Sequence, residues 1–334
     1  MGIDGVRRAI RAADGPGVSA AVRAEPGLIA AADRAGASLL FEAASAVTGD
    51  CALPPVDAGA TALDVVDRLL AAGADPSQPG RDGWTALHVA GFSGHTALAQ
   101  RLVAAGAPAD ATVDGVDGST PLSFALFYGH PATATAIASA SDGRLRPAPD
   151  DLRSAAGLGD LDGIDRWLGP DGALRSGGDA GMAFRAPIDA FPPRDRPVDA
   201  RTTIDEALTW AARNDRVAAM DLLVARGADV DANPFRGTPL LWATYSDRVG
   251  AARWLLDHGA DPNLRHDFGG SGHGRAATAL HLAAQHGATG CVELLLVHGA
   301  DPTIRDGAHH ATPADWAAEG GQRAVAERLR LITG

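Results

Sequence analysis

Leucine-rich segments of seven or eight residues recur along the chain and are typical of short helices with one buried face. They lie at 65–72, 98–105, 219–226, 251–258 and 292–298. Four of them run directly into the word Gly-Ala-Asp, and the segment 98–105 runs into Gly-Ala-Pro. Glycine supplies the left-handed residue that ends a helix, and Asp starts the turn beyond it. The pattern therefore predicts a series of similar helical units.

A second word, Gly-x-Thr-Ala/Pro-Leu, lies upstream of these helices. It is complete at 83–87 and 118–122, lacks its spacer at 237–240, and lacks its glycine before Thr278 and Thr312. The threonine hydroxyl can cap the helix that follows, and proline suits the first helical turn. Because an alanine-rich stretch follows the word, each unit is expected to contain two helices joined by a turn.

The two words, in this fixed order, resemble the ankyrin repeat, whose consensus includes T-P-L-H-x-A at a period of ~33 residues. The resemblance covers nearly the whole chain. The best copies are 80–113, 235–267 and 268–306, and the weaker ones are 114–147, 201–234 and 307–334. Residues 36–79 and 151–168 are degenerate copies.

The resemblance implies an all-α, ankyrin-repeat solenoid of about eight or nine helix-turn-helix units with finger loops and one long insertion. We expect one solenoid over 1–334, in which each unit packs only on its neighbours. Its expected parts are an N-terminal helical cap at 1–35, a first sub-stack at 36–147, a degenerate repeat plus long insertion at 148–200, and a second sub-stack with a C-terminal cap at 201–334.

Three insertions interrupt the period, at about 48–62, at about 169–201 and from His266 onward (HDFGGSGHGRAA). Solenoids tolerate insertions on one face, which is often the binding face. The segment 169–201 is rich in Gly, Pro, Asp and Arg, with one apolar patch from Met182 to Phe191. It is either a spacer at a weak junction or a lid over a site, and the sequence leaves both open.

The composition narrows the chemistry. The chain has 334 residues and no Lys, so all 29 basic residues are Arg. A Schiff-base lysine, a P-loop lysine and a kinase-type lysine are therefore excluded. Arg without Lys is also typical of a GC-rich, bacterial gene. No serine-hydrolase, zinc-protease or dinucleotide-binding motif is present, so the sequence favours a protein that is not an enzyme.

Net charge and cysteine content limit the kinds of partner and ligand that we expect the chain to bind. The formal net charge of −12 disfavours nucleic acid. The two cysteines, Cys51 and Cys291, form neither a disulfide framework nor a thiolate metal site. No stretch of about 18 apolar residues occurs, so we expect no membrane span. A cytoplasmic protein without a cofactor is the prediction, and its acidic surface favours a protein partner of basic or mixed charge.

The resemblance places a binding groove on the concave surface formed by fingertips and inner helices. A line of large rings at positions expected to face solvent, from Trp84 to Tyr245, is what such a groove needs. The alternative is that fingers or the long insertion cover these rings. The predicted groove residues are Trp84, Phe92, Phe127, Tyr128, Arg213, Asn214, Arg236, Tyr245, Gln285, His286 and Glu319.

A second set of large residues recurs four positions after the threonine of the second word. We interpret these residues as filling gaps between repeats in a core that is poor in aromatic residues. The column contains Val89, Phe124, Trp210, Trp242, Leu282 and Trp316.

Histidines fall into two groups. By resemblance, His88 and His281 bond near their own threonines and fix the turn, and His95 and His130 are structural as well. The other group lies in two successive fingers and could converge on a divalent metal or a general base, although spacing on fingers favours no metal. This polar cluster contains His266, Asp267, His273, His309 and His310.

Two functions follow from these observations. The first is a non-catalytic protein-binding scaffold that uses the concave aromatic groove. The alternative is a small-molecule-binding protein or an enzyme, a biosynthetic one included, that binds an apolar ligand in a pocket between the concave face and the 169–201 insertion.

Overall fold

The computed structural model describes residues 2–30, 37–48, 59–113, 118–139, 151–180, 199–234, 236–267 and 275–333. The chain forms two compact units, 1–148 and 149–334, and each is described by itself. The prediction of one continuous solenoid over 1–334, with its caps and sub-stacks, stays a prediction.

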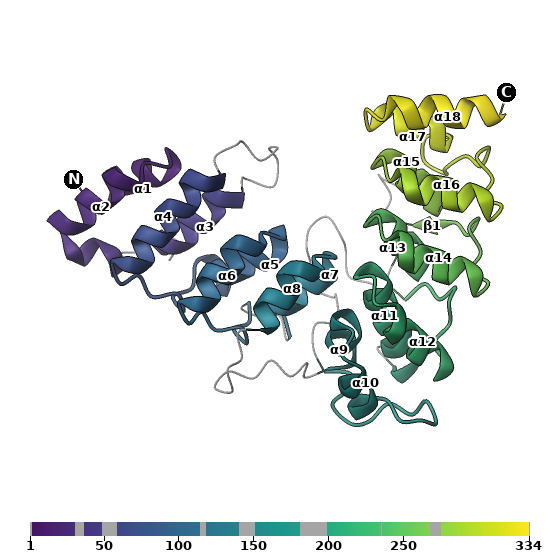
Figure 1. Ribbon diagram of the computed structural model, residues 1–334, viewed down its shortest axis with the longest axis horizontal. Helices are drawn as coiled ribbons and strands as arrows, with labels where there is room; N and C mark the ends of the chain where they lie inside the picture. The colour runs from purple at the N-terminus through teal and green to yellow at the C-terminus, as the bar shows by residue number, and fades with distance from the viewer. Residues whose placement is uncertain are drawn as a thin grey trace. The chain divides into compact units, whose positions relative to one another are not determined.

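The first unit is built from successive helix pairs (Figure 1). Within each unit, the first helices of successive pairs pack on one another and are called inner helices here, and the second helices are called outer helices. Short 3-10 turns lie at Pro26–Ala30 and Arg81–Gly83. The helices are α1 (Ile3–Arg11), α2 (Gly15–Ala24), α3 (Leu39–Thr48), α4 (Gly59–Ala71), α5 (Ala86–Ser93), α6 (Thr96–Ala104), α7 (Pro121–Phe127) and α8 (Pro131–Ala138).

The second unit repeats the same arrangement. A two-stranded antiparallel ribbon of β1 (His266–Asp267) and β2 (Arg275–Ala277) forms one finger between helix pairs. The helices are α9 (Leu152–Leu158), α10 (Leu161–Trp167), α11 (Ala200–Arg213), α12 (Val217–Ala225), α13 (Pro239–Tyr245), α14 (Val249–Asp257), α15 (Ala279–Gln285), α16 (Thr289–Val297), α17 (Pro313–Glu319) and α18 (Arg323–Thr333). The predicted all-α repeat fold is confirmed.

The recurring words act as their chemistry predicts. The hydroxyls of Thr85, Thr120 and Thr238 accept hydrogen bonds from the third backbone N–H of α5, α7 and α13. The glycines of the Gly-Ala-Asp words, such as Gly227 and Gly259, have φ near +100° and +90°. Each glycine therefore ends an outer helix in the left-handed conformation, which glycine adopts without a steric cost.

Small residues let neighbouring inner helices approach closely. A methyl group on Gly91 of α5 would overlap the carbonyl oxygen of Pro121 at the start of α7. The same holds for Gly320 against the carbonyl oxygen of Gln285 in the second unit. Because a backbone oxygen lies where a β-carbon would be, the inner helices can keep this spacing only with glycine at these two positions.

Large rings fill the remaining space between repeats, as the sequence predicts. Phe124, Trp210, Trp242 and Trp316 are each 5% exposed or less. Trp242 and Trp316 share a small apolar cluster with Leu241, Leu282 and Ala277. These four rings of the column therefore belong to the core.

An Asp/Asn ladder links successive turns of the second unit. The Asp205 carboxylate accepts a hydrogen bond from the backbone N–H of Asp229 (3.0 Å), and the Asp231 carboxylate accepts one from the N–H of Asp261 (3.0 Å). The Asn263 side-chain oxygen accepts the next one from the N–H of Asp301 (2.8 Å). Asp205 thus orders the turn of its own repeat, and Asp231 and Asn263 each order the turn of the next repeat.

Candidate functional site

Five aromatic rings form a contiguous cluster on the inner-helix face of the first unit. Trp84 precedes α5, and its ring lies 4.8 Å from that of Phe124 and 5.9 Å from that of Phe92 (centroid to centroid). Phe92 contacts Tyr128 edge-on at 4.5 Å. Trp84, Phe92 and Tyr128 are partly exposed, whereas Phe124 and Phe127 are 5% exposed. The cluster therefore has a buried base and an accessible edge of three rings.

The expectation that Phe127 faces solvent is wrong. Phe127 is the last residue of α7, and its ring packs edge-on against Tyr128 at 5.2 Å. Phe127 therefore packs beneath the three accessible rings and does not belong to the accessible edge.

A second aromatic group lies on the inner helices of the second unit. The Arg213 guanidinium lies over the Trp242 ring, 4.1 Å from its centroid, and 5.9 Å from the centroid of Tyr245. The Tyr245 ring contacts His286 edge-on at 4.7 Å. Tyr245 is partly exposed and His286 is exposed. Successive repeats thus bring a cation, two large rings and an imidazole together.

Three polar residues that were expected to face solvent are buried instead. Arg213 is 4% exposed because it stacks on Trp242 of the next repeat. Asn214 is 1% exposed, and its amide donates to the Trp210 carbonyl oxygen (2.9 Å) at the end of α11. Arg236 is 8% exposed and lies in a finger turn with φ of 54°. Of the remaining groove residues, Gln285 is partly exposed and Glu319 is exposed. The binding role of the eleven groove residues stays a prediction.

His88 and His281 have the roles that the resemblance implies. The backbone N–H of Thr85 donates to His88 Nδ1 (3.0 Å), so the proton lies on Nε2, which donates to the carbonyl oxygen of Ser119 in the next repeat (2.9 Å). His281 repeats this with Thr278 (3.1 Å) and Ala311 (3.2 Å). Burial lowers the pKa of both imidazoles to about 4. They are neutral links between repeats.

His95 and His130 also hold structural positions. His95 Nδ1 accepts a hydrogen bond from the backbone N–H of Leu98 (3.2 Å) at the start of α6. His130 Nε2 lies 3.2 Å from the carbonyl oxygen of Phe92. His130 therefore joins two helix pairs next to the aromatic cluster.

The predicted polar cluster of the fingers is described only in part. His266 is buried at 3% exposure, whereas His309 and His310 are exposed. His273 and the side chain of Asp267 lie outside the described residues. In the described part of the chain, no group of three or more His, Cys, Asp or Glu side chains is arranged to hold a metal ion.

Asp306, which no sequence pattern indicated, organises the finger between α16 and α17. Its carboxylate accepts hydrogen bonds from the backbone N–H groups of Ala308 (2.8 Å) and His309 (2.7 Å) and from Trp316 Nε1 (2.8 Å). Burial opposes ionisation, but these donors outweigh it and lower the pKa of Asp306 to about 2. The residue is therefore a fixed anion that shapes the loop.

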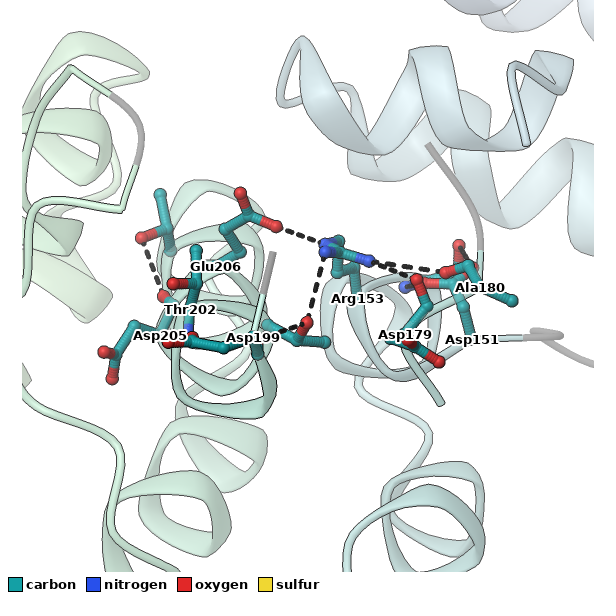
Figure 2. Close-up of polar contacts among 11 residues, drawn as sticks. Asp151, Arg153, Asp179, Ala180, Asp199, Thr202, Asp205 and Glu206 are labelled. Carbon is teal, nitrogen blue, oxygen red and sulfur yellow. Dashed lines mark hydrogen bonds and ion pairs between the residues drawn. The ribbon is translucent and has the colours of Figure 1, made fainter. Parts of the chain in front are cut away.

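A buried arginine, Arg153, holds the described beginning of the long insertion and was also missed. Figure 2 shows its guanidinium between the Glu206 carboxylate of α11 and the carbonyl oxygens of Asp179 (3.2 Å) and Ala180 (3.3 Å). Its Nη2 atom donates to Thr203 Oγ1 (3.4 Å). The only sequence signal was an arginine inside the short, apolar helix α9, since Glu206 is 53 residues away.

The described part of the 169–201 insertion packs on its own repeat. Leu168 and Leu174 form an isolated antiparallel bridge, and the N–H of Arg175 donates to the Trp167 carbonyl oxygen (2.8 Å). Helices α9 and α11, which flank the insertion, still pack directly on each other. The alternatives of lid and spacer concern 181–198, which lie outside the described residues.

A shallow groove of about 310 Å³ lies between the outer helices α6 and α8 of the first unit. Its lining is mostly small or aliphatic: Gln100, Val103, Ala104, Ala132, Thr135, Ala136 and Ser139. None of the aromatic residues lines it, so it offers positions for control substitutions.

Comparison with known families identifies the repeats. A family model for ankyrin repeats in three copies matches residues 57–145 and 194–266, and a single-repeat model of the same family matches 277–307. Together the matches cover more than half of the chain. The chain matches none of the curated proteins with which it was compared. In the described residues, no helix is long and apolar enough to cross a membrane.

Proposed function

Because the chain belongs to the ankyrin-repeat family, we propose that it is a non-catalytic scaffold that binds a protein partner through the aromatic face of its first unit. Ankyrin repeats generally mediate protein–protein interaction. The finer assignment rests on one observation, the accessible edge formed by Trp84, Phe92 and Tyr128. We refer to these three residues as the aromatic edge.

The aromatic edge has the properties of an interaction hot spot. Aromatic side chains are enriched at such sites because they contribute a large contact area and lose little conformational entropy. The rings here are already held by Phe124, Phe127 and the inter-repeat bond of His88. A partner therefore meets a surface that is ordered before binding.

Charge adds a constraint on the partner. The net charge of −12 disfavours strongly acidic proteins as a whole and favours partners of basic or mixed charge. The alternative of a small-molecule site under the insertion stays a prediction, as does a cytoplasmic location.

Site-specific photocrosslinking in cells tests the proposal. A photoreactive amino acid at position 128 is expected to capture a discrete protein, and the same amino acid at Gln100, on the outer-helix groove, is not. A second variant, Phe92→Ser with Trp84 intact, is expected to abolish capture while thermal melting shows a folded chain. Equal capture from position 128 and position 100, or capture that survives Phe92→Ser, contradicts the proposal.

A further inference from the structure

The fingers of the last repeats carry exposed cationic side chains although the chain as a whole is acidic. Arg265, Arg275 and Arg305 are exposed. His309 and His310 are exposed as well and follow Arg305 in the finger between α16 and α17. We refer to these five residues as the basic finger strip.

Main-chain and side-chain contacts hold the strip together. The Arg265 Nη1 atom donates to the carbonyl oxygen of Arg305 (3.5 Å), and Arg305 Nη1 donates to the carbonyl oxygen of His310 (2.7 Å). The N–H of Gly307 donates to the carbonyl oxygen of Arg275 (2.7 Å). Two neighbouring fingers thus bring the three arginines close together.

The described ion pairs of the second unit do not include the three arginines of the strip. Within the described residues, no carboxylate lies within ion-pair distance of Arg265, Arg275 or Arg305. Two acidic groups of the same repeats have other partners, and the pKa of Asp315 is lowered first by its bonds to Thr312 and less by the charges of Arg330 and Arg305. Asp306 is 1% exposed and accepts bonds from its own finger, while Asp315 caps α17 and lies 3.9 Å from Arg330.

Some other arginines of the second unit are paired with carboxylates. On the outer helices, Arg328 pairs with Glu293 (3.0 Å) and Arg226 pairs with Asp165. Among the described residues, the side chains of Arg265 and Arg305 bond only to carbonyl oxygens and that of Arg275 makes no hydrogen bond, so most of their donors remain available. A guanidinium has five N–H donors in a planar fork that matches a carboxylate.

We propose that the basic finger strip docks a segment of a partner protein that is rich in Asp and Glu. Charge complementarity carries the inference, because a carboxylate-rich chain supplies acceptors for three guanidinium groups that form no ion pair with the described residues. Nucleic acid offers anions as well, but its charge is continuous, so it also faces the acidic remainder of a chain of net charge −12, whereas a short acidic segment faces only the strip. The strip is a second surface, and its assignment does not depend on the aromatic edge.

The test measures binding of a short, fluorescently labelled peptide rich in Asp and Glu to the full chain. We expect binding that weakens as ionic strength rises. The combined variant Arg265→Gln, Arg275→Gln and Arg305→Gln is expected to raise the dissociation constant by about tenfold or more. The control variant removes the same charge from outer helices through Arg166→Gln, Arg253→Gln and Arg323→Gln, and is expected to bind within about twofold of the unmodified chain.

A single substitution guards against loss of folding. The Arg275 side chain makes no hydrogen bond within the described residues, so Arg275→Glu is expected to weaken peptide binding and leave thermal melting unchanged. The proposal is overturned if the peptide does not bind, if the control and strip variants bind alike, or if a single-stranded oligonucleotide binds the strip more tightly than the peptide. None of these outcomes depends on the aromatic-edge crosslinking, so failure of either proposal can be recognised separately.

Discussion

Arg153 of α9 and Glu206 of α11 form an ion pair from which water is almost excluded, with side-chain exposures of 1% and 12%. The same guanidinium also binds two carbonyl oxygens of the insertion and the Thr203 hydroxyl. One residue thus joins two inner helices and the described beginning of the long insertion (Figure 2).

Replacing Arg153 is therefore expected to destabilise the second unit. Arg153→Met leaves Glu206 without its cation and the two carbonyl oxygens without donors, at a cost of about 3 kcal/mol in the free energy of unfolding. Arg328→Met removes an ion pair with a half-exposed Glu293, and we expect a much smaller loss because water screens this pair. Urea unfolding, with hydrogen exchange of α9 and α11 amides, distinguishes the two. Equal losses for both variants contradict the role of Arg153.

Stability should fall as the solution is acidified below pH 6.5. Because burial lowers the folded-state pKa of His88 and His281 from 6.5 to about 4, the unfolded chain takes up protons first between these values. The folded state thus keeps its full stability above pH 6.5 and loses up to about 3 kcal/mol per imidazole by pH 4. Urea unfolding at several pH values measures the slope. The double variant His88→Gln, His281→Gln should unfold more easily at pH 7 but show a shallower slope, and an unchanged slope contradicts the assignment.

Asp231→Asn is expected to stabilise the chain at neutral pH. Burial, followed by repulsion from Asp261 and Asp229, raises the pKa of Asp231. Ionisation therefore opposes folding above the unfolded-state pKa near 3.8, and asparagine removes the charge while keeping the acceptor for the Asp261 N–H. Because water screens a half-buried carboxylate, the gain is less than about 1 kcal/mol and disappears at lower pH. Asn263→Asp is the matched reverse exchange and should destabilise, and a gain from both exchanges is inconsistent with the repulsion.

Gly91→Ala is expected to separate α5 from α7. The added methyl group meets the carbonyl oxygen of Pro121, which the backbone cannot withdraw easily, and overpacking of this kind costs about 1–3 kcal/mol. Gly27→Ala serves as the control because its methyl group meets no atom within 4 Å. Thermal melting measures both variants. An unchanged melting temperature for Gly91→Ala argues against a glycine-dependent helix spacing.

The sequence predicts those features that depend on a few neighbouring residues. The caps of Thr85 and Thr238, the left-handed Gly227 and the ring of His88 follow from words whose chemistry is local. Because these words recur, they also identify the helix pairs and the all-α repeat fold.

Contacts between distant residues are not predictable in this way. Arg213 occupies a position expected to face solvent, yet the Trp242 ring of the next repeat lies 4.1 Å from its guanidinium carbon and covers it. The partner of Arg153 is 53 residues away, across an insertion that has no counterpart in the repeat words. The arginines of the basic finger strip lie together only because two fingers of different length contact one another.

Arg153 contacts residues at both ends of the long insertion, and this bears on how the length of such an insertion can vary. The guanidinium binds the carbonyl oxygens of Asp179 and Ala180 and also Thr203, whose hydroxyl donates to the carbonyl oxygen of Asp199 (3.1 Å). The chain leaves the stack of helices and returns to it next to the Arg153 side chain. The packing of the helices therefore does not dictate how many residues lie between Ala180 and Asp199. The position is thus a natural grafting point, where foreign peptides could be displayed without redesign of the neighbouring repeats.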